Sequence, residues 1–388
     1  MEKSTFDLRA FIQKYTMIIA LVVVVVFFSI ITGGKLILPQ NISNLIAQNA
    51  YVFVLAVGML LAILTGGNID LSVGSVVCFV GAIGGKMMSE QKLPVIVAII
   101  AMLIIGTAVG AWQAFWIAYI HIPPFITTLA GMLMFRGLSN IVLNGLTISP
   151  MPDSYLALFN SFIPDPFGVK GFNIMCMIIA TIAIVIYVAL WFKGRMEKIK
   201  KGYEVPKMSS DLTKVILICA LILAIMIQLA RYKGIPSYLI WVLVCVLVYG
   251  YITANTTTGR YFYAVGGNQK AAQLSGIDTK KVFFLAYTNL GFLSAVAAMI
   301  TIARLNSANP TAGDGYEMDA IGSCFIGGAS AYGGTGTVSG VVIGATLMGV
   351  INMGMNIAGV DANWQKVVKG AVLLAAVIFD VVSKRKSS

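Results

Sequence analysis

The sequence predicts an all-α polytopic membrane protein with about twelve transmembrane helices. Of its 388 residues, 59% are hydrophobic and only 11% are charged, and its mean hydropathy is +0.90. Apolar runs of about 18 residues or more, the length that crosses a bilayer as a helix, recur along the whole chain. Lipid forces each spanning element to satisfy its own backbone polar groups. A β-barrel would instead show alternating segments of about ten residues, and the sequence shows none.

The apolar runs divide one transmembrane domain, 1–388, into successive spans. The first, 16–32, has no small-residue cleavage site after it, so we interpret it as a retained helix. A third span follows the polar turn at Ser75 and ends near 88. The other expected spans are 45–65, 94–119, 125–143, 173–192, 215–230, 236–254, 283–303, 318–332, 336–357 and 364–382.

The distribution of basic residues predicts that both termini are cytoplasmic. With twelve crossings, the inner segments carry 17 Lys and Arg and the outer loops carry seven, as the positive-inside rule requires. If 318–332 were only re-entrant, the basic tail at Lys384–Lys386 would face outward. The net charge of +12 therefore reflects membrane topology, and we expect no nucleic-acid partner.

A polar segment, 255–282, lies between two spans and carries four basic residues against the single acid Asp278. Within it, Gln269–Leu274 are good helix formers, preceded by Gly266 and Gly267 and followed by Ser275 and Gly276. We expect a short helix parallel to the membrane, whose small residues Ala271 and Ala272 suit a socket on another protein. An ordinary connecting loop is the alternative.

Two glycine-rich stretches, 64–75 and 331–340, separate apolar runs in a similar way. Both lie between an inward and an outward crossing, so they are consistent with two halves related as a repeat in the same orientation. Close helix packing would also explain the glycines. Asp70, in the first stretch, is either a turn residue, a helix N-cap or, less favoured, a substrate ligand.

The residues argue against catalysis by this chain. The single histidine, His121, leaves neither a metal cluster nor a Ser-His-Asp candidate, and no Walker A loop is present. The five cysteines all fall in apolar runs. Within those runs Arg136 is the clear ionisable residue, so the series of intramembrane acidic residues that proton-coupled carriers usually need is missing. A chain that moves a neutral solute without a nucleotide site or a series of intramembrane acids needs another protein to supply the energy.

Several motifs together resemble the permease subunits of ribose-, galactose- and xylose-type ABC importers. They cover nearly the whole chain in the family's order: Ile69–Ser75, Pro124–Met132, Gly259–Asn268, Leu274–Ile277, Asn309–Gly313, Glu317–Ile321, Ile326–Gly328 and Trp364–Gly370.

The resemblance implies a subunit of a larger machine in a bacterial plasma (inner) membrane. Such a permease dimerises, binds two cytoplasmic ATPase subunits that hold the ATP and Mg²⁺, and receives a monosaccharide from an extracytoplasmic binding protein. The chain itself would carry no cofactor and would not be an enzyme. The polar segment then resembles the family's ATPase-coupling element, at Gly266, Gly267, Asn268, Ala271, Ala272, Ser275 and Gly276.

Family members often have ten spans, so the pair 173–192 and 215–230 looks like an insertion. It would divide the core into 16–172 and 234–382, with 173–233 inserted. This insertion resembles the xylose or multiple-monosaccharide branch more than the ribose branch, although the sugar stays open. The basic loop 193–214 of the insertion suits anionic lipid headgroups, at about 1 kcal/mol per basic residue.

Two further groups of candidate site residues follow. Scattered amides, an acid and an aromatic residue are candidates for the substrate pathway: Gln48, Asn49, Asp70, Trp112, Asn289 and Asn356. In the outer loop 304–319, Arg304, Asp314 and Glu317 are candidates for docking the binding protein. Each could equally be a packing or capping residue. The alternative function is a stand-alone secondary carrier or channel for a small neutral solute, which would work without ATP.

Overall fold

The computed structural model describes residues 8–168, 171–203, 205 and 208–385, and these residues are almost entirely helical. Within them no strand forms, and the only β pairings are isolated bridges from Ile148 to Ala308 and from Phe162 to Pro236. The helices are α1 Leu8–Ile31, α2 Pro39–Leu64, α3 Val73–Gly85, α4 Val95–Ala118, α5 Pro124–Leu143, α6 Asp153–Phe159, α7 Ile174–Lys200, α8 Met208–Ala230, α9 Ser237–Asn255, α10 Thr257–Gly267, α11 Gln269–Leu274, α12 Thr279–Leu305, α13 Tyr316–Ile326, α14 Val338–Ile357 and α15 Ala362–Arg385, with a 3₁₀ turn at Lys35–Ile37 and a π-helical turn at Lys86–Glu90.

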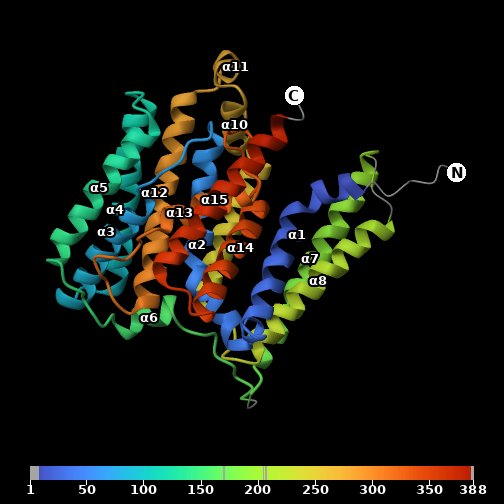
Figure 1. The fold of residues 1–388 in the computed structure, drawn as a ribbon, viewed down its shortest axis with the longest axis horizontal. Coiled ribbons are helices and arrows are strands. Elements are labelled where there is room, and N and C mark those ends of the chain that lie inside the picture. Colours follow the sequence, from blue (N-terminus) through green and yellow to red (C-terminus); the bar gives the residue numbers. More distant parts are fainter. Residues whose placement is uncertain (1–7, 169–170, 204, 206–207, 386–388) are drawn as a thin grey trace.

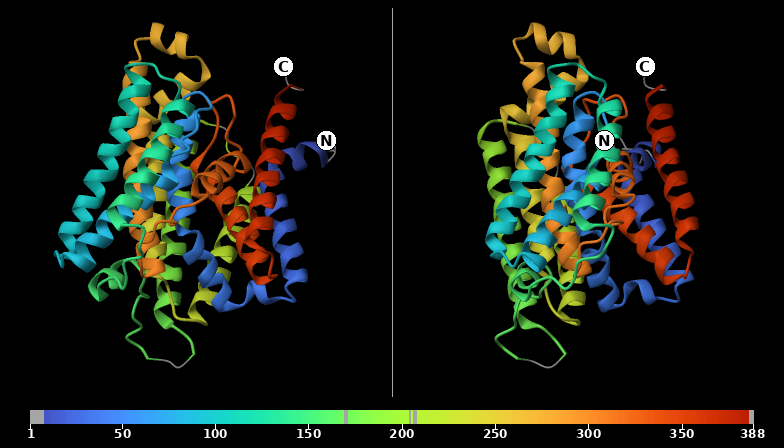
Figure 2. Two further views of the ribbon diagram at one scale, coloured as in Figure 1. Left: turned by 60° about the vertical axis from the view of Figure 1, so that its left-hand side comes forward. Right: turned by 90° about the vertical axis from the view of Figure 1, so that its left-hand side faces the viewer.

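The long helices run roughly side by side, with α11 and the end of α15 at one end of the bundle and α6 at the other (Figure 1). We call these the α11 end and the α6 end. Figure 2 shows α11 projecting beyond the ends of the long helices. This arrangement fits a multi-pass protein.

The expected count of twelve full crossings is not confirmed. Nine of the described helices are long and apolar enough to span a membrane, and α1 adds a shorter apolar part, Thr16–Ile31. The expected span 318–332 is only the 11-residue α13, which is about 16 Å long at 1.5 Å per residue, against a hydrocarbon core of about 30 Å. It ends at Ile326 because Gly327 and Gly328 follow, the latter with φ of 81°.

The core is built around α2 and α12. Nearly all of α2 from Asn49 to Leu64 is buried, and α12 packs on α2, α3 and α4. The contact between α4 and α12 depends on glycine: a Cβ on Gly110 would lie 2.8 Å from the Cα of Gly291. Small residues let the two backbones approach this closely, as is usual where membrane helices pack.

The expected insertion, 173–233, forms a helical hairpin longer than the apolar runs indicated. Helix α7 continues to Lys200 and α8 begins at Met208, so much of the basic stretch 193–214 is helical. Lys, Arg and Glu are good helix formers, and Arg195 forms an ion pair with Asp211 across the hairpin. At the α6 end, the backbone N–H of Asn173 donates to the carbonyl of Ala230 over 2.8 Å. The two ends of the hairpin therefore meet.

A short helix, α6, forms in the proline-rich segment 144–172, where none was expected. Pro152 precedes it in an extended conformation and Asp153 occupies its first turn, where an acid favours a helix. Tyr155 and Phe159 are fully buried beneath it, and the Tyr155 hydroxyl donates to the carbonyl of Met299 over 2.8 Å. Helix α6 thus closes the α6 end of the bundle over α12.

Candidate functional site

A polar cavity of about 150 Å³ lies between α2, α12, α13, α14 and α15. The cavity lies toward the α6 end of the bundle. Two of the residues that line it, Asn356 near the end of α14 and Gln365 near the start of α15, are both close to that end. The cavity is lined by Gln48, Asn49, Tyr51, Arg304, Tyr316, Asn352, Asn356, Gln365 and Lys369. All of these side chains can form hydrogen bonds, and none of them is a carboxylate.

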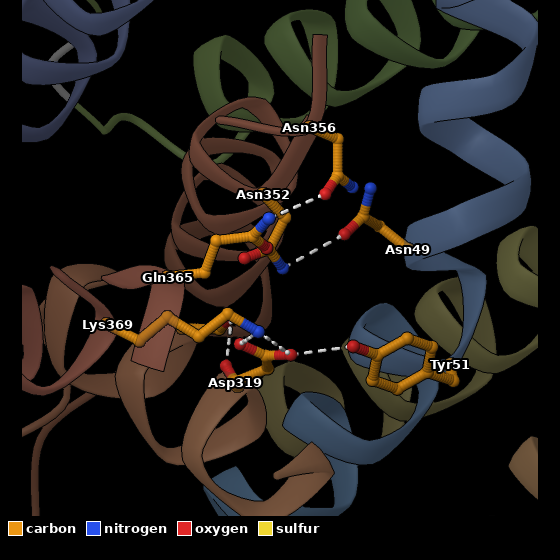
Figure 3. A network of polar contacts seen from close by, with 8 residues as sticks. Asn49, Tyr51, Asp319, Asn352, Asn356, Gln365 and Lys369 are labelled. Carbon is orange, nitrogen blue, oxygen red and sulfur yellow. Dashed lines mark hydrogen bonds and ion pairs between the residues drawn. The ribbon is translucent and has the colours of Figure 1, made fainter. Parts of the chain in front are cut away.

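Amide side chains form one part of the cavity wall (Figure 3). The Nε2 of Gln365 donates to Oδ1 of Asn356 over 2.9 Å, and Asn49 and Asn352 approach each other to 3.5 Å. The Oδ1 of buried Asn352 has no hydrogen-bond partner among the described residues. Amides both donate and accept hydrogen bonds, so this wall can bind hydroxyl groups in either sense.

A buried ion pair forms the other part of the wall (Figure 3). Asp319, which is 1% exposed, accepts a hydrogen bond from the hydroxyl of Tyr51 over 2.6 Å. Its carboxylate also lies 2.9 Å from the ammonium of Lys369. The ring of Tyr51 stacks on that of Tyr316, with centroids 3.4 Å apart. These contacts join α2, α13 and α15, and the carboxylate is already neutralised within the protein.

The structure brings together three of the six candidate pathway residues, Gln48, Asn49 and Asn356. The other three lie elsewhere. Buried Asp70 accepts from the N–H and hydroxyl of Ser72 over 2.7 and 2.6 Å, and so shapes the turn before α3.

Trp112 packs against Phe135 and Trp116, and Asn289 accepts from the Tyr249 hydroxyl over 2.8 Å. Sequence reasoning missed five residues of the cavity wall and the acid beside it: Tyr51, Tyr316, Asn352, Gln365, Lys369 and Asp319. Two signals could have indicated them: Asn352 and Asn356 lie one turn apart in an apolar run, and Lys369 is ionisable within one.

The three candidate docking residues are also separated. Arg304 lines the cavity, whereas Asp314 is exposed and lies 3.5 Å from Lys366. Glu317 is partly buried near Gly74, because a Cβ on Gly74 would lie 2.5 Å from its Oε2. Arg136 holds the same loop: its guanidinium donates to the carbonyls of Pro310 and Ala312 over 3.1 and 2.8 Å. The arginine within an apolar run therefore has a structural partner.

The expected short helix in the polar segment is present as α11. The Asn268 side chain accepts from the N–H of Ala271 over 3.0 Å, an N-cap that starts the helix. Ala271 and Ala272 do not share an exposed face, because Ala272 is buried against the body. The outer face instead carries Ala271 and Leu274, the latter 91% exposed. Gly266 and Gly267, which were expected to precede this helix, are the last residues of α10.

Comparisons with known proteins agree with this architecture. Residues 41–377 match the family described as branched-chain amino acid transport system permease component. The xylose transport system permease protein XylH of Haemophilus influenzae is 37% identical over 97% of this chain and 98% of its own length, and that of Escherichia coli K12 is 35% identical over 97% and 93%. The ribose import permease protein RbsC of Escherichia coli K12 is 32% identical over 96% and 95%.

No solved structure matches the chain. The family match covers most of the residues, and the relatives match over almost their full lengths. The chain therefore belongs to the family of transport-system permease components.

Proposed function

We propose that the chain is the membrane-spanning subunit of an ATP-driven ABC importer that moves a monosaccharide, xylose or a related aldose, into the cytoplasm. The observation that carries the proposal is its similarity, over almost the whole chain, to xylose and ribose permeases. The amide-lined cavity supports it, because sugar hydroxyls both donate and accept hydrogen bonds.

In this proposal the cavity is part of the sugar pathway. Binding sites for small polar molecules combine a few polar groups with aromatic surfaces, and here Asn49, Asn352 and Asn356 lie near the stacked rings of Tyr51 and Tyr316. Lys369 is paired with Asp319, so Arg304 is the other charged side chain in the cavity wall. The cavity faces the α6 end, from which the sugar would enter.

The ATPase subunits would bind at the α11 end, on the cytoplasmic side. Helix α11 offers an apolar side chain, Leu274, that projects from a polar surface, and buried apolar anchors supply much of the affinity of an interface. Each permease of a homodimer would present one such helix, so two ATPase subunits would bind. ATP and Mg²⁺ belong to those subunits.

A sugar-binding protein would dock at the α6 end, on the outer side of the membrane. The exposed pair of Asp314 and Lys366 offers charge of both signs, which sets orientation and on-rate more than affinity. We expect Asp314→Lys to slow delivery from the binding protein. Unchanged delivery by a folded Asp314→Lys permease would exclude docking through this residue.

The test is uptake of labelled xylose by proteoliposomes that contain the permease and its ATPase, with the binding protein outside. We expect uptake that requires ATP and the binding protein, and no uptake of leucine. The stand-alone carrier predicts the opposite pattern, in which an ion gradient or the sugar gradient suffices and ATP has no effect. Uptake of that kind would overturn the proposal.

The position of the ATPase contact has its own test. Ala271→Trp places a bulky ring on the exposed face of α11, so we expect loss of ATPase binding in a pull-down from detergent. The matched control is Lys200→Trp at the exposed end of α7, which should leave binding unchanged. The reverse result would place the contact on the hairpin.

A further inference from the structure

Three glycine pairs, distant in the sequence, meet where α10 touches the body of the protein. They are Gly66 and Gly67 after α2, Gly266 and Gly267 at the end of α10, and Gly333 and Gly334 between α13 and α14. We call this contact the glycine joint. The two glycine-rich stretches that the sequence showed as similar thus touch each other and the segment that carries α11.

The joint consists of backbone packed directly on backbone. The N–H of Gly334 donates to the carbonyl of Leu64 over 3.0 Å. A Cβ on Gly266 would overlap that same Leu64 oxygen and lie 2.5 Å from the nitrogen of Gly334. A Cβ on Gly333 would lie 2.5 Å from the Cα of Gly66. Because glycine has no side chain, a movement of one of these backbone segments cannot be absorbed by a change of side-chain rotamer and must move the segment it touches.

A side-chain hydrogen bond adds to the backbone contact. The hydroxyl of Tyr263, on α10, donates over 2.9 Å to the carbonyl of Gly336, two residues beyond the last glycine pair. Helix α10 is therefore tied both to the end of α2 and to the segment that precedes α14.

The same segments lead to the walls of the polar cavity. Helix α2 ends at Leu64, in the joint, and carries Asn49 and Tyr51 nearer the α6 end. Helix α14, which carries Asn352, begins at Val338, shortly after the third glycine pair, whereas α13, which carries Asp319, ends at Ile326 and is joined to that pair by a non-helical segment. Helices are stiff along their axes, so a displacement at the joint reaches the cavity through α2 and α14.

We propose that the glycine joint is the element that transmits movement of α11 to the sugar pathway. This inference rests on the proposed role of α11 as the ATPase contact. Coupling between distant sites needs a contiguous physical connection with more than one arrangement. The joint supplies the connection, and Gly266 is its positioning residue, because a β-carbon there would hold α10 away from Leu64 and Gly334.

The test compares Gly266→Ala with Gly137→Ala. Gly137 lies in the middle of α5, outside the joint, and a Cβ there would meet no atom of the described chain within 4 Å. We expect Gly266→Ala to retain the ATPase subunit and ATP hydrolysis while sugar moved per ATP falls roughly tenfold, which equals about 1.4 kcal/mol of coupling free energy. Gly137→Ala should match the wild type in all three measurements.

Equal coupling in the two variants would overturn the inference, and so would loss of ATPase binding in Gly266→Ala. If Gly266→Ala does not fold, Tyr263→Phe decides, because it keeps the ring on α10 and removes the hydroxyl that donates to Gly336 and also contacts Thr253. Sugar moved per ATP must then fall with assembly intact, and wild-type coupling would reject the joint. Failure of the proposed function would look different, since the wild type itself would show no ATP-dependent uptake.

Discussion

Helix α2 and the α7–α8 hairpin are both apolar, yet they occupy opposite environments. In the most apolar part of α2, 83% of the residues are buried, compared with 11% in α7 and 17% in α8, although α7 is the more apolar helix. In a membrane, apolar character does not determine whether a helix is buried in the protein core, because lipid is as apolar as leucine. Burial depends on small residues and paired polar groups, and α2 has both.

The largest effect should come from breaking the ion pair that holds α2, α13 and α15 together. Lys369→Met leaves the carboxylate of Asp319 buried without its cation, and we expect a loss of up to about 3–5 kcal/mol. The measurement is thermal unfolding of the permease in detergent.

The control is Lys366→Met, one turn away on α15. Its ion pair with Asp314 is exposed on both sides, so the expected loss is about 0–1 kcal/mol. The double variant Asp319→Asn, Lys369→Met should recover part of the stability, because no charge is then left unpaired. Equal unfolding temperatures for the two single variants would contradict the view that buried polar pairs hold the core.

Replacing glycine by alanine should change the stability by a smaller amount, with opposite signs in the core and in the α7–α8 hairpin. Gly291→Ala in α12 places a Cβ 2.6 Å from the Cα of Gly110, and overpacking of this kind costs about 1–3 kcal/mol. Gly194→Ala in α7 meets no described atom within 4 Å, so helix propensity should stabilise it by about 0.5–1 kcal/mol. Thermal unfolding again gives the sign. Destabilisation by both variants would show that α7 packs more tightly than its exposure indicates.

The smallest effect should follow removal of the whole hairpin. Because Asn173 and Ala230 are hydrogen-bonded to each other, residues 174–230 can be excised and the gap closed by a short glycine linker. We expect the shortened permease to assemble and to keep ATP-dependent uptake in proteoliposomes, since neither the cavity nor the glycine joint includes the hairpin. Loss of uptake with assembly intact would assign the insertion a part in transport.

The sequence allowed the long helices to be placed because each must be an unbroken apolar run. It gave a wrong length for α13, since alternating apolar and small residues continue past Gly327 although the helix does not. It also missed α6, whose stability comes from burying Tyr155 and Phe159 and not from a periodic pattern.

The candidate site was only partly predictable for a related reason. Gln48, Asn49 and Asn356 stood out as amides in apolar runs, but so did Asn289, which pairs with Tyr249 instead. Asp319 and Lys369 are 50 residues apart, and nothing in the spacing of the chain says that they meet. Residues that meet only through tertiary packing leave no pattern in the local sequence from which their contact could be predicted.

The pairing of Asp319 with Lys369 also constrains how the protein is made. Helix α13 has 11 residues and carries Glu317 and Asp319 in its first turn, and an unpaired acid is costly to place within a membrane. When α13 leaves the ribosome, its cation has not yet been synthesised. The segment is therefore unable to settle in the bilayer alone, and we expect it to insert together with α14 and α15, as one unit completed when Lys369 arrives.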